Sequence, residues 1–168
     1  DDTYYVDTPD DLTFEAAAGG TDSVIAEISG AGYYLWAQTE NLTLVGSTPF
    51  GVGNELANSL TGSEQVNWLL GGSGNDTLNG KAGNDVLFGE GGIDTFIFEA
   101  GTGGDVVGDF ATGIDKVLLT GLGFTSFDQV TASMTTDGIS TALNLGDGDY
   151  VVFNGVTMAS FAAGDFVL

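Results

Sequence analysis

The sequence predicts an all-β fold in which nine-residue repeats stack into a parallel solenoid, and three observations support this prediction. Glycine accounts for 28 of the 168 residues, and part of it recurs every nine residues. The glycines of this series are Gly53, Gly62, Gly71, Gly80 and Gly89. The sixth position of the same register holds Asn58, Asn67, Asp76, Asp85 and Asp94. The eighth position holds Leu60, Leu69, Leu78, Leu87 and Phe96. Agreement among three positions makes coincidence a poor explanation.

Nine residues divide naturally into a tight turn of six and a strand of three. Glycine supplies the positive φ values that such a turn needs. Neighbouring strands lie about 4.8 Å apart, so successive coils place their turns in a column. The apolar residue at the eighth position then points inward and forms the core of the solenoid. If two repeats make one coil, Asp76 faces Asp94, and Asp85 faces Asn67 on one side and the turn over 99–105 on the other.

Composition excludes several function classes. The chain has 24 Asp and Glu against two Lys and Arg, for a net charge of −22, and it contains no His and no Cys. The absence of Cys and His removes thiol chemistry, Cys zinc sites and the Ser–His triad. The scarcity of cations argues against binding to nucleic acids or to anionic membrane surfaces. No apolar run reaches the 18 residues of a membrane span. An acidic chain rich in oxygen ligands favours a hard cation such as Ca²⁺.

Three repeats are the sharpest: GGSGNDTLN over 71–79, GKAGNDVLF over 80–88 and GEGGIDTFI over 89–97. They follow the pattern G-x-x-G-x-D-x-U-x, where U is a large apolar residue. Stacked turns direct backbone carbonyls and the carboxylate of the sixth position into the gap between coils, which offers about six oxygens and suits Ca²⁺ better than Mg²⁺. The candidate carboxylate ligands are Asp76, Asp85 and Asp94, and Asp also simply favours turns. The other candidate ligands in the repeats are Gly72, Ser73, Gly74, Asn75, Ala82, Gly83, Asn84, Gly92, Asn67 and Asn58.

These repeats resemble those of the RTX (repeats-in-toxin) family. The segment Asp2–Asp7 is similar to the strand that closes an earlier repeat block, which implies that part of a larger protein precedes it. Three further segments, 11–15, 20–24 and 40–44, resemble the divergent spacer coils of the family. Two acids in these coils, Glu15 and Asp22, leave both a ligand role and a turn role open.

The C-terminal part resembles the cap of serralysin-type domains, in which the two acids of D-x-x-x-D-F commonly bind calcium. The resemblance implies Asp105 and Asp109 as further calcium ligands. The segment 143–151 is similar to the closing hairpin of that cap, with Asp147, Gly148 and Asp149 in its loop. The last residues, Asp165–Leu168, resemble the uncleaved signal that type I secretion machinery recognises at a C-terminus.

The resemblance implies a right-handed parallel β-roll with an antiparallel β cap. We expect divergent coils over 1–52, nonapeptide repeats over 53–105, and the cap with the secretion signal over 106–168. We expect several Ca²⁺ ions as cofactors and a chain that is not itself an enzyme. The expected function is a secreted, extracellular or cell-surface module that folds on extracellular Ca²⁺ and serves secretion and folding of a larger protein.

Four aromatic residues leave a second function open: Tyr33, Tyr34, Trp36 and Trp68. They are either a stacking platform for an extracellular glycan or ordinary packing of the roll. The first reading describes a calcium-dependent carbohydrate-binding module of an extracellular enzyme acting on polysaccharides. A third possibility is a structural fragment of an adhesin or surface layer, whose mark would be calcium-dependent self-association.

Overall fold

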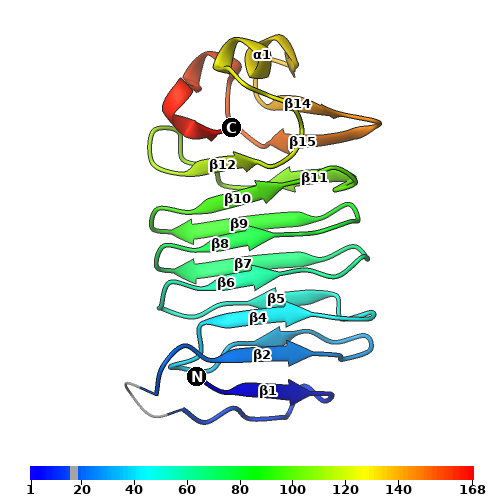
Figure 1. The fold of residues 1–168 in the computed structure, drawn as a ribbon, viewed down its shortest axis with the longest axis vertical. Helices are drawn as coiled ribbons and strands as arrows, with labels where there is room; N and C mark the ends of the chain where they lie inside the picture. Colours follow the sequence, from blue (N-terminus) through cyan, green and yellow to red (C-terminus); the bar gives the residue numbers. More distant parts are fainter. Residues whose placement is uncertain (16–18) are drawn as a thin grey trace.

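The computed structural model describes residues 1–15 and 19–168 and consists mainly of two eight-stranded sheets. Figure 1 shows the coils stacked along the long axis, with the N-terminal strand at one end and the cap at the other. The first sheet contains, in spatial order, β1 (Thr3–Val6), β2 (Ser23–Ala26), β4 (Asn41–Leu44), β6 (Ser59–Thr61), β8 (Thr77–Asn79), β10 (Thr95–Phe98), β12 (Lys116–Leu119) and β16 (Phe166–Val167). All neighbouring strands of this sheet are parallel.

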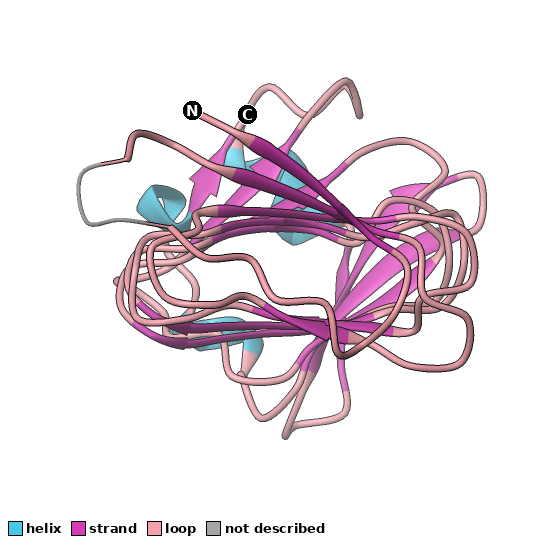
Figure 2. Ribbon diagram, turned by 90° about the horizontal axis from the view of Figure 1, so that it is seen from below, coloured by secondary structure: helices cyan, strands magenta, loops and turns pink. Residues whose placement is uncertain are grey.

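The second sheet faces the first across a flattened tube, which Figure 2 shows end-on. It contains, in spatial order, β13 (Met134–Thr136), β14 (Thr141–Gly146), β15 (Asp149–Phe153), β11 (Gly104–Val107), β9 (Val86–Gly91), β7 (Trp68–Ser73), β5 (Phe50–Val52) and β3 (Tyr33–Tyr34). The parallel pairs of this sheet are β3–β5, β5–β7, β7–β9, β9–β11 and β11–β15. The pairs β13–β14 and β14–β15 are antiparallel. The predicted all-β fold, a parallel roll with an antiparallel cap, is confirmed.

Strand register shows that two nonapeptides form one coil. Ser59 pairs with Thr77 in one sheet, and Trp68 pairs with Val86 in the other, each 18 residues apart. From β2 to β12 the strands alternate between the two sheets along the chain, so consecutive repeats supply turns to opposite sides of the roll. Residues of the sixth position therefore form two separate columns.

The apolar eighth position forms the core, as predicted. Leu60, Leu69, Leu78, Leu87 and Phe96 are all essentially buried. Because side chains of a strand alternate between its two faces, the three-residue strands β6 and β8 bury the middle residue and leave its neighbours half-buried.

The roll is closed at its C-terminal end by the β14–β15 hairpin, the helix α1 (Phe127–Ala132) and the short 3-10 helices η1 (Met158–Ser160) and η2 (Ala163–Asp165). Phe110, Phe153 and Phe161 pack edge-on or tilted against one another, with ring centroids 5.1–5.6 Å apart. Strands β12 and β16 extend the first sheet of the roll beyond residue 105, into the segment expected to be cap. In the described part of the chain, no helix is both long enough and apolar enough to cross a membrane.

Candidate calcium centre

The residues at the sixth position lie in the turns that precede the short strands, in two columns. One column contains Asn58, Asp76 and Asp94, and the other contains Asn67 and Asp85. The backbone continues the first column to Asp115 and the second to Asp105, because these residues precede β12 and lie in β11 respectively. All seven side chains are buried, with exposures of 0–4%.

Each column is a ladder of hydrogen bonds from a backbone amide to the carboxylate of the next coil. In the first column, the amide of Asn58 donates to Asp76 Oδ1 (2.8 Å), and that of Asp76 donates to Asp94 Oδ1 (2.9 Å). In the second column, the amide of Asn67 donates to Asp85 Oδ1 at 2.8 Å. One oxygen of each of these carboxylates is thus engaged in stacking the coils.

The second oxygens of two carboxylates lack the hydrogen bonds that the first oxygens make. Asp76 Oδ2 and Asp85 Oδ2 are buried and have no hydrogen-bond partner among the described residues. A buried charged oxygen without a partner is costly. The residues present therefore fit a hard cation, whose ligands are oxygens of this kind.

The first glycine of each sharp repeat leaves room beside this oxygen. A Cβ atom on Gly71 would lie 2.4 Å from Asp76 Oδ2, and one on Gly80 would lie 2.2 Å from Asp85 Oδ2. Any larger residue would fill that space. At Gly53 and Gly62 a Cβ atom would instead meet the backbone carbonyl of the next coil and the side-chain oxygen of Asn58 or Asn67. The recurrence of glycine is therefore explained by the close approach of the sixth-position oxygen and of the next coil.

Burial raises the pKa of Asp76 to about 6 and that of Asp85 to about 7, and the nearby carboxylates of Asp94 and Asp105 add to the increase. The hydrogen bonds from Asn58 and Asn67 lower these pKa values only in part. Burial likewise raises the pKa of Asp105 to about 6 and raises that of Asp94. The ionised form of each column is therefore electrostatically unfavourable without a counter-charge.

The two asparagines are held differently. Asn67 Nδ2 donates to the carbonyl of Thr48 at 2.9 Å, and Asn58 Nδ2 donates to the carbonyls of Thr39 and Glu40 at 3.3 and 3.2 Å. The side-chain amides of both asparagines thus donate hydrogen bonds to backbone carbonyls, which an ionised carboxylate cannot do because it has no hydrogen to donate. Among the sixth-position residues that the structure describes, the buried oxygens without a partner belong to Asp76 and Asp85, and not to either Asn.

Gly72 and Ser73 end strand β7, and the other predicted turn residues lie in the turns beside these carboxylates. The four glycines among these residues have a positive φ, which residues with a side chain rarely adopt. The φ values are 101° at Gly72, 124° at Gly74, 137° at Gly83 and 150° at Gly92. The amide oxygens of Asn75 and Asn84 accept hydrogen bonds from the next coil, at Ile93 N and Gly104 N. Ser73 donates its backbone amide to Asn54 O, and Ala82 lies in the turn between β8 and β9.

The two cap acids are both engaged in hydrogen bonds. Asp105 Oδ1 accepts from the amide of Asp85 and its Oδ2 accepts from the Thr102 hydroxyl, at 2.9 and 2.6 Å. Asp109 is exposed and accepts from the amides of Gly89 and Glu90 at 3.0 and 2.8 Å. Their calcium-binding roles remain predictions.

Sequence reasoning did not select Asp115 as a site residue, and it named Asp165 only as part of the C-terminal secretion signal. Asp115 continues the first column, accepting from Asp94 N at 3.0 Å, and Asp165 accepts from Gly113 N and Ala162 N, both at 2.8 Å. The signal for Asp115 was present, since Asp115-Lys116-Val117 repeats the Asp-x-apolar spacing of the nonapeptides.

The structure separates the four aromatic residues. Tyr33 is buried (1% exposed), and its hydroxyl donates to the carbonyl of Asp11 at 3.1 Å, so it belongs to the core. Tyr34 and Trp68 are 60% and 53% exposed. They line, with Phe50, a shallow hollow of about 500 Å³ on the outer face of β3, β5 and β7. Trp36 is also exposed and lines a neighbouring hollow with Tyr34.

Residues 53–96 match the family model of the RTX calcium-binding nonapeptide repeat, in four copies. This segment is therefore an RTX calcium-binding repeat array, and the chain that contains it is a β-roll domain.

Two relatives come from Rhizobium meliloti (strain 1021). The chain is 43% identical to the endo-1,3-1,4-beta-glycanase EglC and 44% identical to the endo-1,3-1,4-beta-glycanase ExsH, in each case over all 168 of its residues. It spans only 33% of the length of each relative. Among solved structures, the extracellular lipase LipA of Serratia marcescens matches with a TM-score of 0.50 and 16% identity, over 91% of this chain and 40% of the lipase. This last likeness concerns the fold alone.

Proposed function

We propose that this chain is the calcium-dependent folding module of a larger secreted protein. The observation that carries the proposal is the pair of buried oxygens, Asp76 Oδ2 and Asp85 Oδ2, which have no hydrogen-bond partner among the described residues. Asp76, Asp85 and Asp94, with backbone oxygens of the neighbouring turns, are the residues that would hold Ca²⁺. In this proposal Asn58 and Asn67 are not ligands, and their backbone amides join adjacent coils by donating to Asp76 and Asp85.

Bound Ca²⁺ supplies positive charge and takes six to eight oxygen ligands, so one ion can join oxygens from adjacent coils. Without it, the net charge of −22 and the entropy of 28 glycines oppose compaction. At cytosolic calcium levels the chain stays expanded and fit for export. At about millimolar calcium outside the cell, binding free energy becomes folding free energy.

The module is proposed to serve a catalytic part that lies outside this chain. Its relatives are glycanases about three times as long as the segment that they share with it. In this proposal, Asp165–Leu168 carries the signal for type I secretion, and the folded roll supports the attached catalytic domain after export.

Far-UV circular dichroism during a calcium titration tests the proposal, with magnesium as the control. We expect a cooperative transition from coil to β structure at about 0.1–1 mM Ca²⁺ and none with Mg²⁺. A β-rich spectrum that is unchanged by excess chelator would mean that the roll folds without metal, and the proposal would be wrong.

A second candidate, calcium-dependent carbohydrate binding, is favoured by the hollow lined by Tyr34, Phe50 and Trp68. Exposed aromatic rings are suited to stacking on the apolar faces of sugars. Affinity electrophoresis in a β-1,3-1,4-linked glucan tests it: Trp68→Ala should abolish retardation. Tyr5→Ala removes an even more exposed ring from the opposite sheet and should leave the retardation unchanged. Unretarded wild-type protein would exclude this candidate for that glycan.

A further inference from the structure

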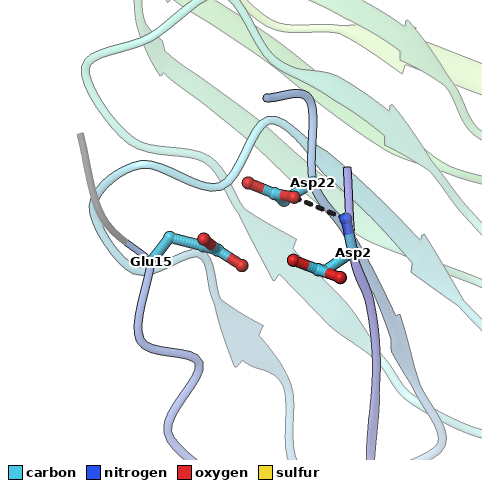
Figure 3. A group of neighbouring side chains, drawn as sticks. All are labelled: Asp2, Glu15 and Asp22. Carbon is cyan, nitrogen blue, oxygen red and sulfur yellow. Dashed lines mark hydrogen bonds between the residues drawn. The ribbon is translucent and has the colours of Figure 1, made fainter. Parts of the chain in front are cut away.

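Three carboxylates from separate segments meet at the N-terminal end of the roll, outside the nonapeptide repeats. Asp2 directly precedes β1, Asp22 directly precedes β2, and Glu15 lies in the connection between the two strands. One carboxylate oxygen from each residue lies within 4.8 Å of the other two. Figure 3 shows the three side chains directed toward one common space.

An independent feature of Asp22 points to a ligand in that space. Its side chain is 1% exposed, and its Oδ2 atom is buried with no hydrogen-bond partner among the described residues. Its other oxygen, Oδ1, accepts the amide of Asp2 at 2.6 Å and lies 3.6 Å from the amino group of Asp1. The unpartnered oxygen is the same feature that marks Asp76 and Asp85 in the repeats.

The spacing of the oxygens fits one ion. Ligands of Ca²⁺ lie 2.3–2.6 Å from the metal, so two ligands of the same ion are at most about 5 Å apart. Three carboxylates at this separation repel one another unless a cation lies between them. Carboxylate oxygens, in a chain without His or Cys, select a hard cation over zinc.

The position is separate from the repeat array. Asp22 belongs to the first column by register, since its amide donates to Glu40 Oε2 and Glu40 lies 18 residues later. The next members of that column are Glu40, which accepts the amide of Asp22, and Asn58, whose side-chain amide donates to the carbonyls of Thr39 and Glu40. Two hydrogen-bonded residues therefore lie between this cluster and Asp76.

We propose that Asp2, Glu15 and Asp22 form a Ca²⁺ site that fastens the first strand of the roll to the second. Strand β1 lies at the edge of its sheet and, among the strands described, pairs with β2 alone. An ion held by residues before both strands and by the loop between them closes that loop and stabilises the edge. The Tyr4 hydroxyl donates to Glu15 Oε1 and positions this carboxylate.

Counting bound ions in the 168-residue chain tests the site, by equilibrium dialysis against Ca²⁺ with metal analysis. We expect Glu15→Gln and Asp2→Asn each to bind one Ca²⁺ fewer than wild type, or to bind that ion at least about tenfold more weakly. Both residues lie outside the core, so their variants should keep the β-rich spectrum in calcium. Asp10→Asn, an exposed acid of the same coil, is the control and should bind as wild type does. Unchanged ion number and affinity in both variants would overturn the site.

A second measurement separates this inference from the proposed function. The calcium titration followed by circular dichroism is repeated for Glu15→Gln, whose folding should still depend on Ca²⁺ because the carboxylates of the repeats are intact. If Glu15→Gln binds as many ions as wild type with equal affinity, and wild type folds only with Ca²⁺, the site is absent and the repeat function stands. If wild type folds without calcium but loses one bound ion on Glu15→Gln, the site stands and the proposed function is wrong.

Discussion

At the sixth position of the repeats, Asn58 and Asp76 occupy neighbouring coils of one column and differ only in an amide nitrogen against an oxygen. The amide of Asn58 donates to two carbonyls of the preceding coil, whereas Asp76 Oδ2 has no partner among the described residues. Asn58 Oδ1 accepts the amide of Asn54 in its own turn, whereas Asp76 Oδ1 accepts the amide of Asn58 in the neighbouring coil. The same fold therefore accommodates either residue, and the exchange alters the charge of the gap.

Asp76→Asn is expected to raise the calcium concentration at the midpoint of folding at least about threefold, because the charge of the ligand set falls. The ladder bond from Asn58 N is kept by the amide oxygen. A calcium titration followed by circular dichroism measures the midpoint. Asp85→Asn and Asp94→Asn should behave in the same way.

Asp137→Asn is the matched control for this prediction. Asp137 is exposed in the loop between β13 and β14, where its carboxylate accepts the amides of Ile139 and Ser140. Its replacement leaves the calcium midpoint unchanged. Equal midpoints for Asp76→Asn and Asp137→Asn would contradict the assignment of the ligands.

At the scale of elements, the hairpin β14–β15 closes the roll through one acid at its start. The loop contains Asp147 and Gly148, with φ values of 53° and 98°, as a two-residue turn requires. Asp149 follows this turn and accepts the amides of Gly101 and Gly103, at 2.6 and 3.1 Å, while β15 pairs in parallel with β11. The turn residues shape the hairpin, and Asp149 attaches it to the last coil.

Asp149→Ala is expected to destabilise the calcium-loaded chain by about 1–3 kcal/mol, because two backbone amides lose a charged acceptor. Thermal unfolding in saturating calcium measures this loss. Asp147→Asn, in the same loop, should have little effect because Asn tolerates a positive φ. Similar melting temperatures for Asp149→Ala and wild type would contradict the attachment role.

At the scale of the whole molecule, stability depends on carboxylates that the fold buries in two columns. Burial raises the pKa values of Asp76, Asp85 and Asp105 to about 6, 7 and 6, above their ordinary value of 3.8. Between about pH 4 and 7 the calcium-free folded chain therefore binds more protons than the unfolded chain. Its free energy of unfolding then falls as the pH rises through this range.

We expect the calcium-free chain in chelator to have more β structure at pH 5 than at pH 7.5, as measured by circular dichroism. Calcium requires the ionised carboxylates, so the midpoint of the calcium titration should move to higher concentration as the pH falls from 7.5 to 5. A calcium-free chain that is more structured at pH 7.5 would show that these buried acids do not limit folding.

Much of the fold could be predicted from periodicity. The nine-residue spacing of Gly and of the apolar eighth position predicts coils, an inward-facing core and stacked turns, because each depends on residues close in sequence. The pairing of Asp76 with Asp94 and of Asp85 with Asn67 follows from the same arithmetic, and the hydrogen bonds agree with it.

Contacts between distant segments could not be predicted in this way. Tyr33 is adjacent in sequence to Tyr34 and close to Trp36, but its side chain faces the interior of the roll and is buried, whereas that of Tyr34 faces outward. Asp149 accepts the amide of Gly101, which lies 48 residues earlier in the sequence. A nine-residue pattern carries no information about contacts at that separation. The meeting of Asp2, Glu15 and Asp22 depends likewise on where the segment that contains Glu15 packs relative to the starts of β1 and β2.

Local repetition was therefore sufficient for the roll, the register of its coils and the columns of Asp, since every coil repeats the same short-range geometry. Only the tertiary structure distinguished the Asp oxygens without partners from the satisfied Asn amides, and only it joined the cap to the last coil. These features depend on which carbonyls, amides and carboxylates lie opposite one another once the coils have stacked, and that is a property of the whole folded chain.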